Sequence, residues 1–278
     1  MSTLLDVIEG RADWCVETGD CPQVMATMPD RSVAHVITDP PYEAEAHTLQ
    51  RRTKQPGWRS IESGDDRVTK IEALDFAPIT SAGRGESAAQ MVRVAARWLL
   101  AFCQAEAVNK WRLSFESSGA SYRRAMVWIK PDGMPQLTGD RPGMGYESIV
   151  AAHAKGRSRW NGGGKHGVYV ASKNSQVEAS GHQTQKPLSL MEALVRDFTD
   201  VGDLILDPFC GSGTTGVACR RLGRRFIGIE LNEKWADVAR RRIGETHEQI
   251  DMLAAEKFSR GAKVKRKQEA LALGEVKP

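Results

Sequence analysis

Long apolar runs, paired cysteines and an export signal are all missing from this sequence of 278 residues. No apolar stretch approaches the roughly eighteen residues that a membrane-spanning helix needs, so we expect no association with a membrane. The segment Met1–Asp6 has neither a basic start nor an apolar stretch with a cleavage site. Because an export signal needs these features, the expected location is the cytoplasm.

The cysteines show no arrangement that binds a metal or forms a disulfide framework. None of the five belongs to a CxxC pair, and no paired histidines lie near them. Zinc sites and disulfide scaffolds depend on such spacings, so we expect reduced thiols and no metal. The net charge of +4 is compatible with a polyanionic partner, but many enzymes without one are equally basic. The cysteines are Cys15, Cys21, Cys103, Cys210 and Cys219.

Short apolar runs rich in β-formers alternate with amphipathic stretches along most of the chain. This alternation is typical of one α/β domain with a mostly parallel sheet covered by helices. Seven strands are expected, at Asp13–Thr18, Ala34–Thr38, Trp98–Cys103, Arg124–Lys130, Glu147–His153, Asp203–Leu206 and Arg225–Ile229. Four helices are expected to pack on the sheet, at Glu86–Arg97, Pro187–Asp200, Thr214–Leu222 and Asn232–Ile243.

Three segments depart from this alternation of strands and helices. The expected catalytic domain comprises residues 1–154 and 183–246. Residues 43–85 are polar and are interpreted as a long mobile connection. Residues 155–182 are rich in Gly, Ser, Lys and Arg, with Trp160 and Tyr169 interleaved, and look too irregular for a core element. Residues 247–278 form a charged tail in which Lys257–Lys267 carries six basic residues.

A strand that runs into a glycine-rich turn is the strongest local signal. Gly211, Gly213 and Gly216 satisfy GxGxxG, and the next strand ends in Glu230, nineteen residues after Gly211. This layout is typical of a nucleotide-binding βαβ unit in which the acid accepts hydrogen bonds from ribose hydroxyls. The pattern does not separate NAD from S-adenosylmethionine, and the alternative is an ordinary turn whose glycines serve packing. A carboxylate at Asp207 suits a cationic sulfonium better than a pyrophosphate, which favours S-adenosylmethionine.

A second motif follows the expected strand at Ala34–Thr38. The residues Asp39, Pro40, Pro41 and Tyr42 come directly after it. Two consecutive prolines fix their φ angles and restrict the residue before each, so the Asp39 carboxylate is held rigidly at the end of the strand. The alternative is a proline-punctuated strand end with a surface aspartate. Ligands of open α/β sheets bind at this edge, which favours a functional interpretation.

Together these motifs resemble the DNA amino-methyltransferases, the enzymes that methylate exocyclic amino groups of adenine or cytosine. Asp39-Pro40-Pro41-Tyr42 is similar to their catalytic DPPY motif, and Asp207-Pro208-Phe209-Cys210-Gly211-Ser212-Gly213 to their FxGxG cofactor motif. Gly19-Asp20-Cys21 and Met28–Val33 resemble the usual lead-in to DPPY, and Gln183–Pro187 the segment before the first cofactor-side helix. The resemblance leaves out residues 43–85, 155–182 and the tail.

The resemblance implies a Rossmann-like, seven-stranded methyltransferase sheet in the permuted motif order of the β group, with a small inserted target-recognition segment at residues 155–182. It implies S-adenosylmethionine as cofactor and double-stranded DNA as partner. Asp39, Pro40, Pro41 and Tyr42 are then catalytic, with Asp39 and the Pro40 carbonyl accepting the hydrogens of the target amine and Tyr42 stacking on the flipped base. The implied cofactor-binding residues are Asp20, Cys21, Thr184, Lys186, Asp207, Pro208, Phe209, Gly211, Ser212, Gly213, Thr214 and Glu230.

Within this set the resemblance assigns parts of the cofactor. Asp20 and Cys21 border its adenine, Glu230 its ribose, and Asp207, Thr184 and Lys186 its methionine end; alternatively Lys186 is a solvated residue before a helix. The basic and aromatic mixture of Arg157, Arg159, Trp160 and Lys165 is expected to contact DNA, and the alternative is a solvated loop.

Adenine is the expected target, because the family uses an acid before Pro-Pro-Tyr mainly for adenine and a serine mainly for cytosine. Cytosine ring-carbon chemistry needs a cysteine that follows a proline, and no Pro-Cys pair occurs here. The remaining alternatives are a cytosine amino-methyltransferase, an inactive DNA-binding relative and a nucleotide-dependent oxidoreductase. The resemblance leaves open a homodimer and a partner restriction nuclease.

Overall fold

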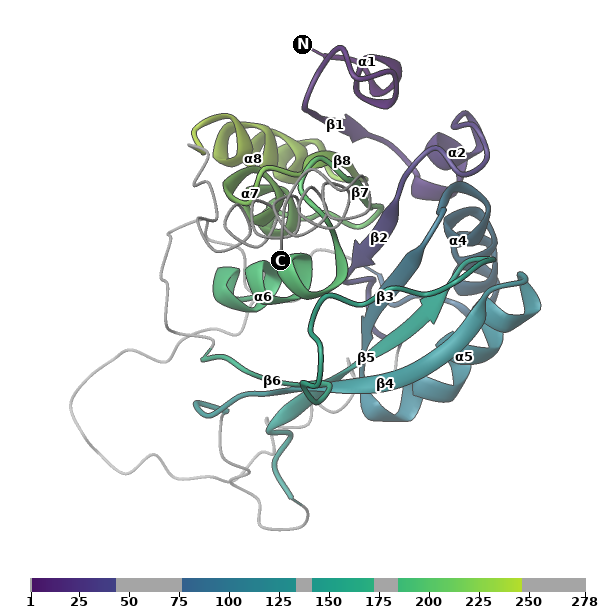
Figure 1. The fold of residues 1–278 in the computed structure, drawn as a ribbon, viewed down its shortest axis with the longest axis vertical. Coiled ribbons are helices and arrows are strands. Elements are labelled where there is room, and N and C mark those ends of the chain that lie inside the picture. The colour runs from purple at the N-terminus through teal and green to yellow at the C-terminus, as the bar shows by residue number, and fades with distance from the viewer. Residues whose placement is uncertain (1, 44–76, 134–141, 173–184, 247–278) are drawn as a thin grey trace, which may run out of the picture.

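One eight-stranded sheet with helices on both faces forms the body of the protein (Figure 1). The structure is a computed structural model that describes residues 2–43, 77–133, 142–172 and 185–246. The strands are β1 (Trp14–Thr18), β2 (His35–Thr38), β3 (Trp98–Cys103), β4 (Ser121–Ile129), β5 (Tyr146–His153), β6 (Val168–Val170), β7 (Leu204–Asp207) and β8 (Arg225–Glu230). The helices are α1 (Leu4–Ile8), α2 (Cys21–Ala26), α4 (Ser81–Val94), the 3-10 turn η1 (Ala105–Ala107), α5 (Val108–Ser117), α6 (Leu188–Phe198), α7 (Thr214–Arg221) and α8 (Glu233–Gly244).

The strand order is β1-β8-β7-β2-β3-β5-β4-β6, and only β5 runs against the others. The carboxyl ends of the parallel strands therefore meet along one side of the sheet, called here the carboxyl edge. Because β5 is antiparallel, its first residues lie at this edge as well: Cys103 at the end of β3 is paired with Ser148 near the start of β5.

Each face of the sheet has its own apolar core. One core contains the buried side chains of α1, α2, α4 and α5, of which Trp111 and Phe115 on α5 are among the largest. The other contains those of α6, α7 and α8. Three of these helices begin at a capping residue: Asp20 accepts from the Gln23 N–H at α2, Thr80 caps α4 and Asn232 caps α8.

The α/β architecture is confirmed, but the expected number of seven strands is wrong. The eighth strand, β6, lies inside residues 155–182, where the composition argued against a core element. It is only three residues long, and its pattern is exposed, buried, exposed, so only Tyr169 points into the core. So short a strand leaves no periodicity to read in the sequence.

The helices on the first face were largely missed by the sequence analysis. The structure shows α1, α2 and α5 where none was expected, and α4 begins at Ser81, inside the presumed connection of residues 43–85. Glu43, at the start of that connection, is buried and forms ion pairs with Arg84 and Lys110. Residues 44–76 and the tail at 247–278 lie outside the described part of the chain, as does Thr184.

Candidate active site

The two sequence motifs meet at the carboxyl edge, although more than 160 residues separate them. Strand β2, which leads into Asp39, pairs with β7, which ends at Asp207. The hydroxyl of Thr38 donates a hydrogen bond of 2.7 Å to Asp207 Oδ1 and joins the two strand ends directly. The predicted catalytic and cofactor motifs therefore form one site, as expected for ligands at this edge of an open α/β sheet.

Packing requires two of the three motif glycines. Gly213 has φ +82°, and a Cβ there would lie 2.9 Å from Ala239 Cβ on α8. A Cβ on Gly216 would collide with the side chains of Ile243 and Phe226. Both glycines therefore serve the packing of the turn and α7 against α8 and β8, whereas a contact of this turn with a ligand remains a prediction.

Glu230 lies at the end of β8 beside the glycine turn. Its Oε2 accepts a hydrogen bond of 2.8 Å from the Gly211 N–H, and its Oε1 accepts one of 3.0 Å from the Asn232 N–H. The Gly19 N–H donates to the Glu230 carbonyl at 3.0 Å, which brings the exposed Asp20 next to this acid. Cys21 follows Asp20 and is buried, and burial raises the pKa of its thiol to about 12. The structure thus brings the expected adenine and ribose contacts together.

Asp207 is buried, and both of its oxygens are engaged within the protein. Besides Thr38, the hydroxyl of Thr215 donates to Asp207 Oδ2 at 2.5 Å, and the Phe209 N–H donates to Oδ1 at 3.2 Å. Burial raises the pKa of Asp207 to about 6, although these donors act in the opposite direction. Asp207 therefore ties β2, β7 and α7 together, and its contact with a methionine group remains a prediction.

Arg242 on α8 is a residue of the turn that sequence reasoning missed. Its guanidinium donates to the Ser212 carbonyl at 2.5 Å and to the Ser212 hydroxyl at 3.0 Å. It also reaches the Thr214 hydroxyl at 3.4 Å. Arg242 is a basic residue in the last turn of an amphipathic helix. Nothing in the sequence indicates that such a residue will donate hydrogen bonds to a loop thirty residues earlier.

Asp39 has one engaged oxygen and one free oxygen. Its Oδ2 forms an ion pair with the ammonium of Lys186, just before α6. Its Oδ1 is buried and has no hydrogen-bond partner within the described residues. Burial raises the pKa of Asp39, and the positive charge of Lys186 opposes that effect. An unpartnered buried acceptor is costly to maintain, so it marks a place where a donor from outside the protein can bind.

Lys186 is buried at the catalytic motif rather than solvated. Its ammonium lies 5.6 Å from the centre of the Tyr42 ring and 5.1 Å from that of Phe102, within the range of cation–π attraction. The Tyr42 hydroxyl donates to Glu147 Oε2 at 2.6 Å. The alternative of a solvated residue before a helix is therefore wrong for Lys186.

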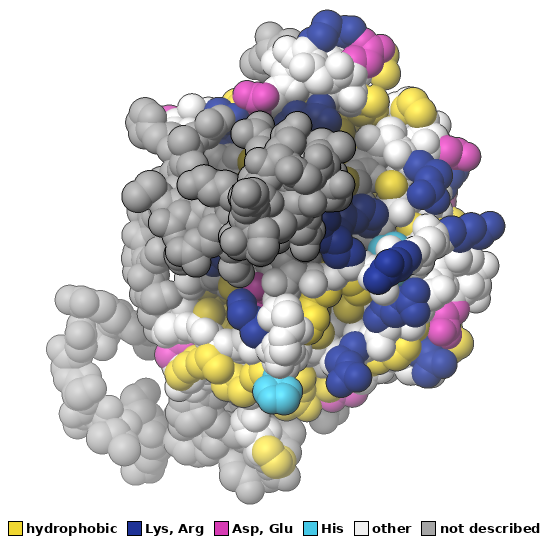
Figure 2. Space-filling view, viewed as in Figure 1, with side chains coloured by type: hydrophobic (Ala, Val, Ile, Leu, Met, Phe, Trp, Pro, Cys, Tyr) yellow, Lys and Arg dark blue, Asp and Glu magenta, His cyan; other side chains and the backbone are white. Residues whose placement is uncertain are grey.

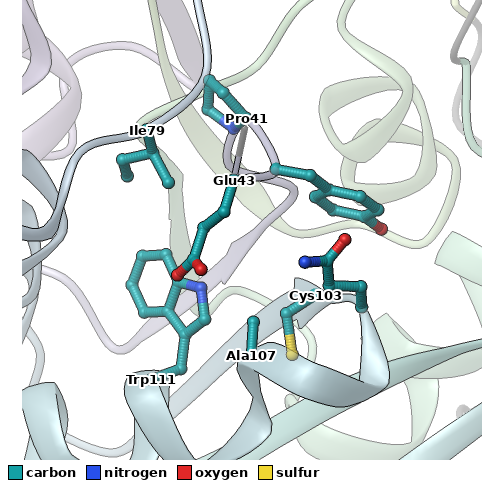
Figure 3. A pocket seen from close by; sticks show the side chains of 8 residues that line it. Pro41, Glu43, Ile79, Cys103, Ala107 and Trp111 are labelled. Atoms are coloured by element: carbon teal, nitrogen blue, oxygen red, sulfur yellow. The ribbon is translucent and has the colours of Figure 1, made fainter. Parts of the chain in front are cut away.

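A narrow hollow beneath Pro41 has Tyr42 among its lining residues (Figure 3). Figure 3 shows the side chain of Glu43 pointing into it from above, toward Trp111 on α5. Its carboxylate pairs there with Arg84 and Lys110. This buried acid anchors the chain directly after the catalytic motif.

The residues expected to contact DNA lie at the opposite edge of the sheet. Trp98, the first residue of β3, donates its indole N–H to the Arg159 carbonyl at 2.6 Å. Lys165 pairs at 2.8 Å with Asp197, near the end of α6, whereas Lys186 stands before its beginning. The eleven residues of α6 span about 16 Å, so Lys165 lies far from Lys186 and Asp39.

Three of these four residues have partners within the protein. Besides Lys165, Arg159 pairs with Asp200 at 3.1 Å, and the ring of Trp160 packs against Phe198 with centroids 6.1 Å apart. Arg157 is exposed, and no ion pair of it occurs within the described residues. Figure 2 shows further Lys and Arg side chains on the side where Figure 1 labels α4 and α5, so positive charge is not confined to residues 155–182.

Neither a metal centre nor a membrane helix emerges from the described residues. No group of three or more His, Cys, Asp or Glu side chains among them could hold a metal ion. None of the helices in residues 2–43, 77–133, 142–172 and 185–246 is long and apolar enough to cross a bilayer. All five cysteines are buried and free of disulfide bonds.

Comparison with known proteins identifies the family of the chain. Residues 33–241 match the N6_N4_Mtase family, described as DNA methylase. The chain belongs to this DNA methylase family. The resemblance inferred from the two motifs is thereby confirmed, whereas the permuted order of the β group remains a prediction.

Individual relatives show how far the likeness extends. This chain is 34% identical over 158 residues to the type II methyltransferase M.Cfr9I of Citrobacter freundii, a match that covers 52% of this chain and 53% of that protein. It is 32% identical over 157 residues to the type II methyltransferase M.XycI of Xanthomonas campestris pv. cyanopsidis, covering 52% of each chain. The matched region thus spans about half the length of these curated relatives.

Solved structures support the fold. A structure of an M1.HpyAVI–SAM complex superimposes with a TM-score of 0.60 at 23% identity, covering 83% of this chain and 98% of that one. The cytosine-N4-specific PvuII DNA methyltransferase superimposes with a TM-score of 0.62 at 14% identity, covering 83% and 86%. At these identities the likeness establishes the Rossmann-like methyltransferase fold.

Proposed function

We propose that this chain transfers a methyl group from S-adenosylmethionine to the exocyclic amino group of a base in DNA. The observation that carries the proposal is the buried Oδ1 of Asp39, which has no hydrogen-bond partner within the described residues, while Oδ2 pairs with the Lys186 ammonium that lies over the Tyr42 ring. Family membership supports the reaction class. The glycine-rich turn at Gly211, whose N–H donates to the Glu230 carboxylate, supports a bound nucleoside.

The residues meet the needs of this chemistry. An exocyclic amine is a poor nucleophile, because its lone pair is delocalised into the ring. Asp39 Oδ1 and the Pro40 carbonyl accept its two hydrogens and favour a pyramidal nitrogen. S-adenosylmethionine, when bound, would supply an electrophilic methyl group and keep the electron pair of the broken S–C bond on its sulfur as the amine nitrogen forms the N–C bond. The proton that the nitrogen then loses passes to the ionised Asp39.

The target base has to leave the DNA stack before Asp39 can reach its amino group. Extrusion costs a few kcal/mol, and stacking on an aromatic ring offsets part of that cost. Tyr42 provides the ring, and its hydroxyl is held by a hydrogen bond of 2.6 Å to Glu147. The ring is therefore positioned before any base arrives.

On the cofactor side, Glu230 is suited to ribose hydroxyls, because backbone N–H groups already fix its carboxylate at the strand end. Asp20 lies beside it and is exposed, so its carboxylate can accept from an adenine amino group. Ser212, Gly213 and Thr214 line the turn into α7, where backbone comes close to the ligand.

Adenine is the proposed target, because the acid Asp39 stands before Pro-Pro-Tyr where cytosine enzymes of the family mainly have serine. The alternatives are a cytosine amino-methyltransferase and an inactive DNA-binding relative. Nucleoside mass spectrometry on DNA from a methylation-deficient host that expresses the chain separates the three. Methylated adenine supports the proposal, amino-methylated cytosine keeps the mechanism but refutes the base, and an unchanged spectrum refutes the activity.

Double-stranded DNA is the proposed partner, and residues 155–182 the proposed target-recognition segment. Arg157 is the strongest candidate for a phosphate contact there, since Arg159 and Lys165 already pair with acids of the protein. The homodimer and the partner nuclease remain predictions.

A further inference from the structure

Four charged side chains alternate in sign through the buried part of the site. Asp39 pairs with Lys186, Lys186 also lies 3.3 Å from Glu147 Oε2, and Glu147 Oε1 pairs with Lys130. Side-chain exposures of 10% for Lys186, 12% for Glu147 and 7% for Lys130 show that water screens these pairs little. Two acids and two bases balance, so no net charge is buried.

Glu147 occupies the centre of this series. It contacts both cations, and its Oε2 in addition accepts the hydrogen bond of the Tyr42 hydroxyl. Through Lys186 it adjoins the catalytic carboxylate, and through Tyr42 it adjoins the proposed stacking ring. Its cations Lys186 and Lys130 hold the pKa of Glu147 at about 2 despite burial, so it is ionised at all ordinary pH values.

We propose that Glu147 is a positioning residue, which holds Lys186 on Asp39 Oδ2 and Tyr42 in its stacking orientation so that Asp39 Oδ1 stays free for the target amine. This inference rests on the proposed function and names a further residue of that same site. The motifs did not single out Glu147 or Lys130.

The geometry explains why a second carboxylate is needed. An ammonium that faces a single carboxylate is drawn to both of its oxygens, and in this site that would cover Oδ1 as well as Oδ2. Glu147 attracts Lys186 from the other side, so the ammonium remains between two acids. Lys186 thereby neutralises Asp39 without occupying the acceptor that the substrate requires.

Glu147 also sets the proton affinity of Asp39. The titratable groups near Asp39 within the described residues include Lys186, Glu147, Lys130, Tyr42 in the same loop, Asp207 at the end of β7 and Cys103 at the end of β3. Burial raises the pKa of Asp39, the charge of Lys186 lowers it, and the charge of Glu147 raises it. Removing the charge of Glu147 therefore lowers the pKa of Asp39. Because the reaction needs ionised Asp39, the acid limb of the rate profile then moves to lower pH.

The main test is Glu147→Gln, which keeps the size of the side chain and an acceptor for the Tyr42 hydroxyl but removes the charge. Single-turnover rates of DNA methylation are measured from pH 5 to 9 with saturating S-adenosylmethionine. The expected result is a rate at least about 10-fold lower at neutral pH. The acid limb of the pH–rate profile of Glu147→Gln is expected to lie about half a pH unit or more below that of the parent protein.

Glu43→Gln is the matched control, because Glu43 is another buried acid between two cations but does not contact Lys186. It is expected to lower stability and to leave the position of the acid limb unchanged. An equal shift in both variants would overturn the proposal, since it would mark a general effect of buried charge.

The double variant Lys130→Met/Glu147→Leu separates positioning from mere stability. Replacing a buried ion pair by apolar side chains is often neutral for folding, so this variant is expected to fold. A folded double variant with the parent rate and the parent acid limb would refute the role of Glu147. If the parent protein methylates no DNA at all, the proposed function itself fails, which is a different result from a parent-like Glu147→Gln.

Discussion

The buried carboxylate of Asp207 predicts an unusual dependence of stability on pH. Raising its pKa from 3.8 to about 6 means that ionising Asp207 costs the folded state about 3 kcal/mol. In the folded protein the group holds its proton up to about pH 6, whereas in the unfolded chain it loses the proton near pH 3.8. Stability therefore falls as pH rises between these values, and the full cost is present above them.

Asp207→Asn removes this cost and keeps an acceptor for the Thr38 hydroxyl. It removes an acceptor from the Thr215 hydroxyl, which is worth about 1 kcal/mol. The variant is thus expected to be more stable than the parent by about 2 kcal/mol at pH 8 and less stable by about 1 kcal/mol at pH 3, where Asp207 is mostly protonated in the folded and the unfolded state. Urea unfolding at both pH values gives the free energies of unfolding directly.

The difference in the free energy of unfolding between Asp207→Asn and the parent protein is expected to change sign with pH, and this change is the decisive feature. Asp203→Asn is a control whose effect on stability is expected to depend on pH in the opposite direction. Hydrogen bonds from His35 and the Asp200 N–H, together with Arg97, hold the pKa of Asp203 below its ordinary value although burial acts the other way. Its ionised form stabilises the fold above pH 3.8, and that contribution is lost as pH falls. Asp203→Asn should therefore destabilise at pH 8 and matter little at pH 3. A stability difference for Asp207→Asn that stays constant between pH 3 and pH 8 would refute the reasoning.

Three further predictions follow from the site. Asp39→Ala should slow methyl transfer by about 10²–10⁴-fold and leave S-adenosylmethionine binding intact, which single-turnover kinetics and calorimetry test together; a turnover rate within a few-fold of the parent would remove Asp39 from the mechanism. Glu230→Ala should weaken S-adenosylmethionine binding in calorimetric titration without unfolding the protein, and unchanged affinity would return Glu230 to a structural role beside Gly211. Arg157→Gln should lower the slope of log K for DNA against log salt by about one unit, while an identical slope would place it off the DNA backbone.

The sequence was most informative where function depends on consecutive residues. Asp39 to Tyr42 and the turn from Asp207 to Gly213 each follow a buried strand, so their meeting at the carboxyl edge could be predicted before the fold was known. A parallel sheet brings the carboxyl ends of its strands to the same side, so two motifs that each follow a strand are expected to lie at the same edge.

The basic segment shows where composition misled. Arg159 and Lys165 look like free cations in the sequence, yet Asp197 and Asp200 at the far end of α6 lie close enough to pair with them. Those partners are more than thirty residues away in the sequence. Charge counted along a segment therefore does not show how much of it remains available to DNA.

Glu147 and Lys130 could not have been found from the sequence for a related reason. Glu147 is the second residue of β5 and Lys130 directly follows β4, and their pairing depends on the register that sets Glu147 opposite Trp128. That register in turn depends on β5 running antiparallel to its neighbours. Had β5 been parallel, its first residues would lie at the opposite edge, far from Asp39. The reversal of one strand is what lets residues from the start of a strand join a site otherwise built from strand ends.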